Sequence, residues 1–231
     1  MHKVIVFDLD GTLAPIGLGI TDADVKKLKA LERAGYTLVI CSGKPSYYLC
    51  GFMRQIELEA PILVGENGAT IQFGVSLPPE RYMVHPCSQR AKEQMGRMRG
   101  LIDEKYGEGI WYQPNEMGLT PFPPNKEVFD GIQSLIDAHK DELDELLVYR
   151  HADSFDLTPK NINKHSGLSL LANALGMTAD DFIAVGDGSN DIPMFEFSDL
   201  SIGIGGKLRY DTDLSFASIG KALDYVLEKK L

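Results

Sequence analysis

The sequence has few cysteines, no long apolar segment and no excess of positive charge. Cys41, Cys50 and Cys87 are odd in number and lack metal-ligand spacing, so we interpret them as reduced thiols of a cytoplasmic protein. No apolar run approaches the length of a membrane span, and no basic stretch followed by an apolar run and a cleavage site opens the chain. We therefore expect neither a membrane segment nor a secretory leader.

The charge balance also restricts the partners. Lys and Arg number 23 against 33 Asp and Glu, which gives a net charge of -10 and argues against nonspecific binding to nucleic acid or anionic membranes. A small phosphorylated substrate stays possible, because one local site can oppose the overall sign. The 231 residues, 44% of them hydrophobic, are enough for one large domain or two smaller ones with a real core.

The first and last thirds of the chain alternate between strand and helix patterns. We expect strands over 4–7, 36–43, 60–69, 181–188 and 200–206, and helices over 21–35, 46–58, 166–176 and 221–230. Strands that alternate with helices predict a parallel, right-handed open sheet.

The middle third has a different pattern. It has expected helices over 88–105 and 126–139 among strand-like pieces at 109–113, 146–151 and 154–159. We therefore predict an α/β protein with a Rossmann-like open parallel-sheet core, formed by residues 1–82 and 157–231, and a smaller inserted α/β domain over 83–156.

Polar residues follow three of the expected core strands. Asp8 and Asp10 come after the strand 4–7, where a period of two places them on the same side of the chain, and Thr12 adds a hydroxyl. Ser42-Gly43-Lys44 follows the second strand and offers a hydroxyl, a backbone N–H and an ammonium to a phosphate. The segment GDGSND (186–191) supplies Asp187, Asn190 and Asp191, and Lys164 stands just ahead of an expected helix.

These strand ends are expected to converge, because ligands of open α/β sheets bind beyond the carboxyl ends of the strands. Four carboxylates in one crevice would repel a phosphate dianion. A divalent cation with oxygen ligands removes the conflict, and Mg²⁺ typically takes one or two carboxylates, waters and a substrate phosphate. The sequence therefore predicts a Mg²⁺ site, with Lys164 and Lys44 adding positive charge.

DLDGTL (8–13), SGK (42–44), the lone Lys164 before a helix and GDGSND resemble the four motifs of the haloacid dehalogenase superfamily of phosphohydrolases. The insertion and the segment ENGA (66–69) resemble the Cof-like branch, whose larger α/β cap occurs in archaeal-type phosphoglycolate phosphatases and several sugar phosphatases. The chain departs from many relatives in having Lys44 where they have Arg or another residue, and His165-Ser166-Gly167 where Gly follows the lysine directly.

The resemblance implies a role for each motif residue. Asp8 would be the nucleophile that forms an aspartyl-phosphate, and Asp10 the general acid and then the base for water. Ser42 and the Gly43 amide would hold the phosphoryl group, and Lys164 would stabilise its charge. The implied metal ligands are Asp8, Asp10 through its carbonyl, Asp187 and, nearby or through water, Asp191; the further substrate-binding candidates are Thr12, Lys44 and Asn190.

The expected activity is therefore hydrolysis of a small phosphorylated metabolite, with phosphoglycolate and a sugar phosphate as the two substrate candidates. Two alternatives are a phosphomutase and a non-catalytic module that accepts phosphate as a signal, although a second carboxylate at Asp10 would shorten the life of such a signal. In the insertion, at least one of Trp111, Tyr112, Asn115 and Glu116 is expected to contact the substrate. The protein is expected to be a monomer or a homodimer.

Overall fold

The computed structural model describes residues 2–206 and 210–231 and divides the chain into two compact units. The first unit comprises Met1–His85 and Asn163–Leu231, and the second comprises Pro86–Ile162. The expected return to the core at residue 157 falls inside strand β9 (Phe155–Pro159), which pairs along its whole length with β8 (Leu146–Arg150). The second junction therefore follows Ile162, because cutting β9 would break this hairpin.

The first unit is built on one eight-stranded sheet with the order β12-β11-β10-β1-β2-β3-β4-β5. The strands from β12 to β3 are parallel, and β4 and β5 extend the sheet in antiparallel pairing. Their bounds are β1 (Val4–Phe7), β2 (Thr37–Cys41), β3 (Ile62–Gly65), β4 (Thr70–Phe73), β5 (Arg81–Val84), β10 (Phe182–Gly186), β11 (Leu200–Ile204) and β12 (Leu214–Phe216). The predicted open, parallel-rich α/β core is confirmed.

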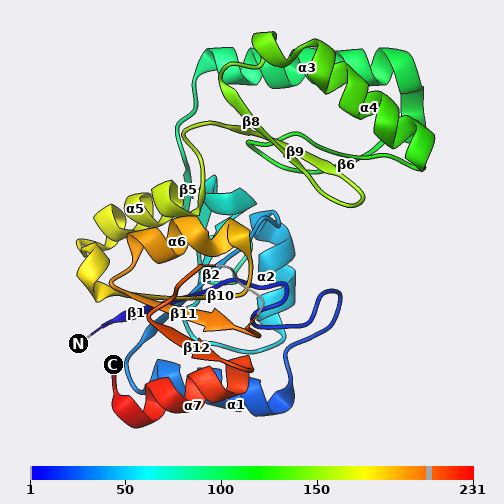
Figure 1. Ribbon diagram of the computed structural model, residues 1–231. Helices are drawn as coiled ribbons and strands as arrows, with labels where there is room; N and C mark the ends of the chain where they lie inside the picture. Colours follow the sequence, from blue (N-terminus) through cyan, green and yellow to red (C-terminus); the bar gives the residue numbers. More distant parts are fainter. Residues whose placement is uncertain (1, 207–209) are drawn as a thin grey trace. The chain divides into compact units, whose positions relative to one another are not determined.

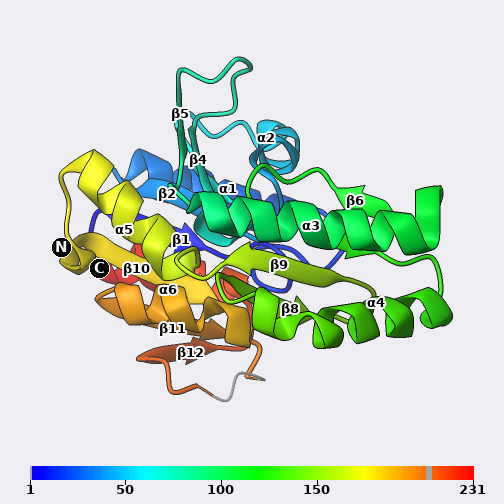
Figure 2. The same cartoon turned by 90° about the horizontal axis from the view of Figure 1, so that it is seen from above.

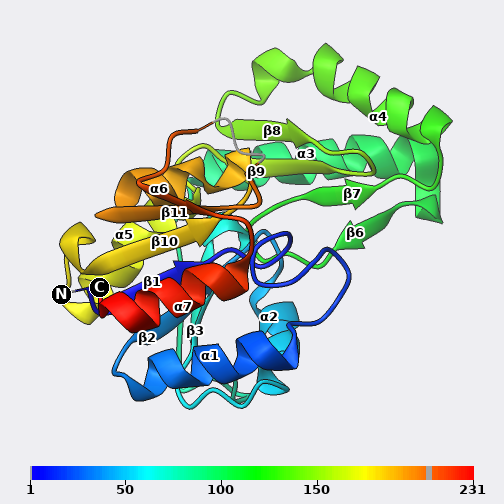
Figure 3. The same ribbon diagram turned by 60° about the horizontal axis from the view of Figure 1, so that its bottom comes forward.

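Helices cover both faces of this sheet, and the side chains of each strand alternate between them (Figure 1). Ile5 and Phe7 pack toward the helices α1, α2 and α7, whereas Val4 and Val6 pack toward α5 and α6. Figure 3 shows α1 and α7 side by side on the first face. The helix bounds are α1 (Asp22–Arg33), α2 (Ser46–Arg54), α5 (Lys164–Leu175), α6 (Ile192–Phe197) and α7 (Ile219–Lys229).

The strand order reverses between β1 and β10, two neighbouring parallel strands at the centre of the sheet. From β1 the chain continues through α1 to β2 on one side, and from β10 it continues through α6 to β11 on the other. Such a reversal leaves a crevice beyond the carboxyl ends of the two strands. Asp8 directly follows β1, and Asp187 directly follows β10.

Two expected elements differ in the structure, and several short elements were not expected. The segment 60–69 is not one strand: β3 ends at Gly65 and is followed by a 3₁₀ turn, Glu66–Gly68, that leads back into β4. The helix expected over 166–176 begins at Lys164, so the lysine belongs to the helix. The short elements β4, β5, α6 and β12 were not predicted, because three to six residues give too little periodicity to read.

The second unit has two helices packed on four short strands. Its elements are α3 (Gln89–Tyr106), β6 (Trp111–Gln113), β7 (Thr120–Phe122), α4 (Lys126–Ala138), β8 and β9. A bridge between Leu119 and Leu157 links the hairpins β6–β7 and β8–β9. Both helices lie on the same side of the strands in Figure 1, and Figure 2 shows them running alongside each other. The core of this unit includes Ile132 and Phe155. Among the described residues of the whole chain, no helix is both long and apolar enough to span a membrane.

Candidate active site

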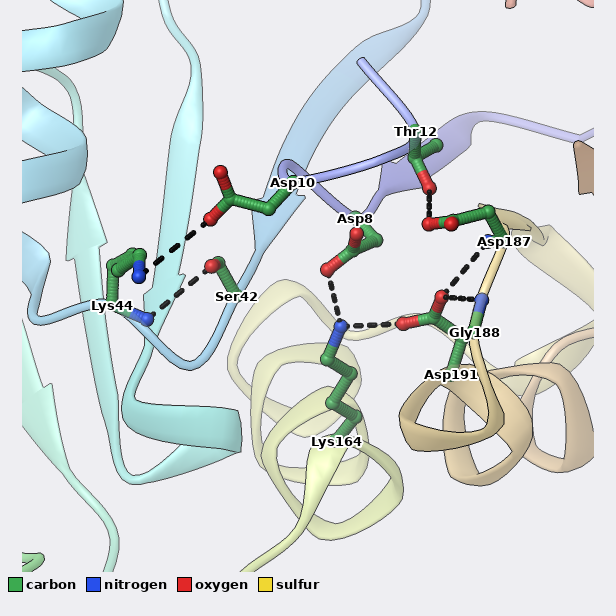
Figure 4. A network of polar contacts seen from close by, with 9 residues as sticks. All are labelled: Asp8, Asp10, Thr12, Ser42, Lys44, Lys164, Asp187, Gly188 and Asp191. Atoms are coloured by element: carbon green, nitrogen blue, oxygen red, sulfur yellow. Dashed lines mark hydrogen bonds and ion pairs between the residues drawn. The ribbon is translucent and has the colours of Figure 1, made fainter. Parts of the chain in front are cut away.

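A buried lysine stands at the centre of the site. Lys164 is only 1% exposed, and its Nζ donates hydrogen bonds of 2.7 Å to Asp8 Oδ1 and 2.6 Å to Asp191 Oδ1 (Figure 4). The carboxylates are equally buried, at 4% and 0% exposure. Buried charges persist only when they are paired and hydrogen-bonded. Folding alone does not require a buried trio of charged side chains at this place.

Asp191 joins the lysine to the loop after β10. Its second oxygen, Oδ2, accepts hydrogen bonds from the backbone N–H groups of Asp187 (2.9 Å) and Gly188 (3.0 Å). The Asp187 carboxylate in turn accepts a 2.9 Å hydrogen bond from the Thr12 hydroxyl. Gly11, at φ +97°, allows this approach, because a Cβ there would lie 2.5 Å from Asp187 Oδ2. The structure therefore orients Asp187 through Thr12, the residue that the sequence analysis assigned to substrate binding.

Burial and neighbouring charges shift the pKa values of Asp8 and Lys164. Burial raises the pKa of Asp8 from 3.8 to about 6, although the Lys164 ammonium opposes the rise. Burial by itself would lower the pKa of Lys164, but Asp8 and Asp191 outweigh it and hold that pKa above its usual value. Lys164 therefore stays protonated, whereas the Asp8 carboxyl group changes its protonation state near pH 6.

Asp10 occupies a separate position. The strand ends at Phe7, so the period of two does not extend to Asp10, and its carboxylate is absent from the acidic cluster formed by Asp8, Asp187 and Asp191. Asp10 Oδ2 instead lies 3.8 Å from the Lys44 ammonium. The prediction that four carboxylates meet is therefore correct for three of them, and the side chain of Asp10 faces a different cation.

The loop after β2 supports Lys44. Ser42 is buried, its Oγ accepts a hydrogen bond from the Lys44 N–H (3.3 Å), and its carbonyl accepts one from the Asn67 N–H (2.9 Å). A Cβ on Gly43 would lie 3.2 Å from the Asn67 side chain. Asn190, by contrast, is exposed in the turn before Asp191, and no described contact joins its side chain to the acidic cluster.

Two features that position Lys164 were not predicted from the sequence. Asn163 caps α5 by accepting a 2.9 Å hydrogen bond from the Ser166 N–H, and its own N–H donates to the Ser166 hydroxyl. The first turn of α5 also touches the 3₁₀ turn through two glycines, because a Cβ on Gly167 would lie 2.4 Å from the Gly68 Cα. The Asn-x-x-Ser spacing was a readable cap signal; the contact between two distant glycines was not.

We expect Gly167→Ala to lower both stability and activity. The added methyl group would collide with backbone atoms of Gly68, which cannot rotate away, and would push the start of α5 and Lys164 out of place. The expected loss is about 1–3 kcal/mol of unfolding free energy, measured by urea denaturation, together with a fall in kcat.

Gly51→Ala is the matched control for this prediction. Gly51 lies inside α2 with no atom near its Cβ position, so alanine there should stabilise the protein by about 0.5–1 kcal/mol. Equal stability of the two variants would show that the glycine contact does not hold α5.

The acidic cluster has the chemistry of a divalent-cation site. One oxygen each from Asp8, Asp187 and Asp191 lies within 4.8 Å of the others. Three carboxylates against the single Lys164 ammonium leave a charge of -3 + 1 = -2 when all are ionised. Both oxygens of Asp191 already accept hydrogen bonds, so Asp8 and Asp187 are the better direct ligands, and hard carboxylate oxygens suit Mg²⁺.

The candidates from the insertion all lie in the second unit. Trp111 is 58% exposed, the Tyr112 hydroxyl donates to Asp103 (2.7 Å), and the Asn115 amide donates to Thr120 (2.8 Å). Glu116 also has polar or electrostatic contacts within the structure. Their expected contact with a substrate stays a prediction.

The fold and the site together define an open-sheet α/β enzyme with a lysine-bridged acidic centre at the reversal of its strand order. Residues 5–84 and 119–207 match the family model of the haloacid dehalogenase-like hydrolases. The chain belongs to this family, and the predicted family and enzyme class, a phosphatase of the haloacid dehalogenase type, are confirmed.

Comparison with individual proteins also finds phosphatases and a hydrolase of this family. The chain is 25% identical over 209 residues to a phosphoglycolate phosphatase of Methanosarcina acetivorans, covering 87% of this chain and 83% of that protein. It is 24% identical over 216 residues to a 5-amino-6-(5-phospho-D-ribitylamino)uracil phosphatase of Bacillus subtilis, covering 88% and 84%. A haloacid dehalogenase-like hydrolase from Bacteroides thetaiotaomicron has the same fold, with a TM-score of 0.82 at 18% identity, covering 98% of this chain and all of that one.

Proposed function

We propose that this protein is a Mg²⁺-dependent phosphomonoesterase that hydrolyses a small phosphorylated metabolite through an aspartyl-phosphate. The observation that carries the proposal is the buried contact of Lys164 with Asp8 and Asp191, beside Asp187 at the ends of β1 and β10. A lysine fixed against a carboxylate nucleophile supplies the positive charge that an incoming phosphoryl group needs. The pairing also holds the Asp8 side chain in one orientation.

The proposed reaction has two steps. In the first, an Asp8 oxygen forms a bond to phosphorus, the bond to the ester oxygen breaks, and Asp10 gives its proton to the departing alcohol. In the second, water attacks phosphorus and gives a proton to Asp10, and the acyl-phosphate bond breaks to restore the Asp8 carboxylate and release phosphate. Ser42 and the Gly43 amide are proposed to hold the transferring oxygens, and a bound Mg²⁺ would neutralise the phosphate charge.

We expect Mg²⁺ to raise the melting temperature of the wild-type protein and Asp187→Asn to abolish this rise. A ligand that binds only the folded state stabilises it, and the substitution removes one of the two best-placed ligands. Asp224→Asn is the control, since Asp224 forms a surface ion pair with Lys27 (2.7 Å). The metal assignment is wrong if Asp187→Asn gains as much melting temperature from Mg²⁺ as the wild type and the control do.

Phosphoglycolate is the first substrate candidate, supported by the likeness to the Methanosarcina acetivorans enzyme, and a sugar phosphate is the second. Initial rates across a panel of phosphoesters, with and without Mg²⁺, test both. One strong metal-dependent preference would identify the substrate class. We further propose a cytoplasmic enzyme, monomeric or homodimeric, with no nucleic-acid or membrane partner.

Phosphate release and the lifetime of phosphorylated Asp8 distinguish the proposed hydrolase from the two alternatives. A phosphomutase would return the phosphoryl group to the substrate and release little phosphate. A signalling module would keep a phosphorylated Asp8 for minutes without turnover. Asp10, held near Asp8 but outside the acidic cluster, favours hydrolysis, because it can accept a proton from water.

A further inference from the structure

Lys44 is the second lysine of the site, and it contacts a different carboxylate from the first. Its Nζ lies 3.8 Å from Asp10 Oδ2, whereas Lys164 donates to Asp8 and Asp191. Among the described residues, Asp10 has no other ion pair. Lys164 thus pairs with the buried carboxylates of Asp8 and Asp191, whereas Lys44 pairs with the partly exposed carboxylate of Asp10.

The backbone on both sides of this ion pair is fixed. The Lys44 N–H donates to the Ser42 hydroxyl, and the Lys44 carbonyl accepts a 3.0 Å hydrogen bond from the Glu66 N–H. Asp10 lies in a tight turn in which the Gly11 N–H donates to the Ala14 carbonyl (2.8 Å). With both ends held, the ammonium has a defined place from which to attract the carboxylate.

Figure 4 shows Lys44 and Asp8 on either side of Asp10. Without Lys44, the Asp10 carboxylate would be free to rotate toward any positive charge, including a cation held by Asp8 and Asp187. The 3.8 Å separation exceeds a direct hydrogen bond, so the ammonium attracts the carboxylate without occupying its oxygens. The side chains of Lys44 and Asp10 are 38% and 29% exposed, as expected for a pair at the mouth of the site.

We propose that Lys44 is a positioning residue that holds the Asp10 carboxyl group toward the leaving-group oxygen. This inference rests on the proposed function, because it assigns Lys44 to the step in which Asp10 gives its proton to the departing alcohol. It differs from the phosphate contact that the Ser-Gly-Lys sequence suggests. A phosphate contact would act on every ester alike, whereas holding Asp10 toward the leaving-group oxygen matters in the first step only, and only where the leaving group needs a proton.

Leaving groups of different basicity test the proposal. With glycerol phosphate, whose alkoxide must be protonated, Lys44→Met should lower kcat by roughly 10- to 100-fold with little change in KM. With p-nitrophenyl phosphate, whose phenolate leaves without a proton, the same variant should stay within about 3-fold of wild type. Lys44→Arg should restore most of the glycerol phosphate rate, since it keeps the charge.

Asp10→Asn and Lys29→Met complete the experiment. Asp10→Asn should lose rate with both esters, because it also removes the base for water, and adding Lys44→Met to it should cost no further rate with glycerol phosphate, because the two residues act together in the first step. Lys29, in a surface ion pair with Glu57, is the matched control and should leave both rates unchanged when replaced by Met.

Each other outcome has a distinct meaning. Equal loss of kcat with both esters in Lys44→Met would overturn the positioning role in favour of a structural one, and a raised KM for both would favour a phosphate contact. Unchanged kinetics would overturn this inference alone. If the wild-type protein hydrolysed neither ester nor any other with Mg²⁺ present, the proposed function would fall together with it.

Discussion

We expect Asp8→Asn to abolish turnover, with a loss of at least about 10³-fold in kcat, because an amide cannot serve as the nucleophile that we propose toward phosphorus. Asparagine has the same shape and keeps an oxygen that can accept from Lys164, so the fold should survive. The measurement is phosphate release under saturating substrate and Mg²⁺. Turnover at the wild-type rate would show that Asp8 does not carry the phosphoryl group.

The same variant should change the pH dependence of stability. The folded-state pKa of Asp8 is raised to about 6, so in metal-free wild type the carboxyl group favours the folded state below about pH 4 and loses that contribution as the pH rises through 6. Asp8→Asn has no such group. Its unfolding free energy should therefore gain on that of wild type between pH 4 and 8, by on the order of 2 kcal/mol.

Urea denaturation of both proteins in EDTA at several pH values measures this difference. Asp224→Asn, at a surface ion pair, provides the control in which the difference should stay small across the same range. A constant gap between wild type and Asp8→Asn from pH 4 to 8 would mean that Asp8 titrates in the folded protein as it does in the unfolded chain.

Lys164→Met has the second largest expected effect and removes activity and stability together. It leaves Asp8 and Asp191 buried without a cation, and breaking a buried ion pair from one side costs about 3–5 kcal/mol. Methionine has nearly the same length, so packing changes little and the loss reports the charge. Chemical denaturation in EDTA at pH 7.5 measures the loss, and kcat should fall below detection.

The cost should shrink at low pH, where Asp8, with its raised pKa, becomes protonated and no longer needs Lys164. Adding Asp191→Asn to Lys164→Met should recover part of the stability, because one stranded carboxylate is removed. Lys27→Met, which breaks only a surface ion pair with Asp224, should cost less than about 1 kcal/mol. A pH-independent loss in Lys164→Met would show that lost packing is responsible.

Much of the core could be predicted from the sequence because its central strands β1 and β10 are short apolar runs. All four residues of β1 are buried, and β10 is buried throughout, which leaves no other place for them than the centre of a sheet. The antiparallel addition of β4 and β5 was not predictable in this way. It depends on the turn Glu66–Gly68, where Asn67 takes a left-handed conformation that its residue type permits but does not require.

The candidate site, like the core, was predicted only in part from the sequence. The sequence by itself determined which residues stand at the ends of the strands: Asp8, Ser42 and Asp187 follow apolar runs, and parallel strands bring their carboxyl ends to one edge. It therefore predicted the kinds of side chain that meet there and the chemistry open to them, because strands that alternate with helices run parallel and end at the same edge.

Only the tertiary structure decided which charges pair. Lys164 meets Asp8, 156 residues away in the chain, while Asp10 turns to Lys44, because β1 ends at Phe7 and a tight turn redirects the chain beyond it. The place of Lys164 depends further on Gly167 meeting Gly68. Such pairings are set by distances between segments far apart in the sequence, which no local pattern records.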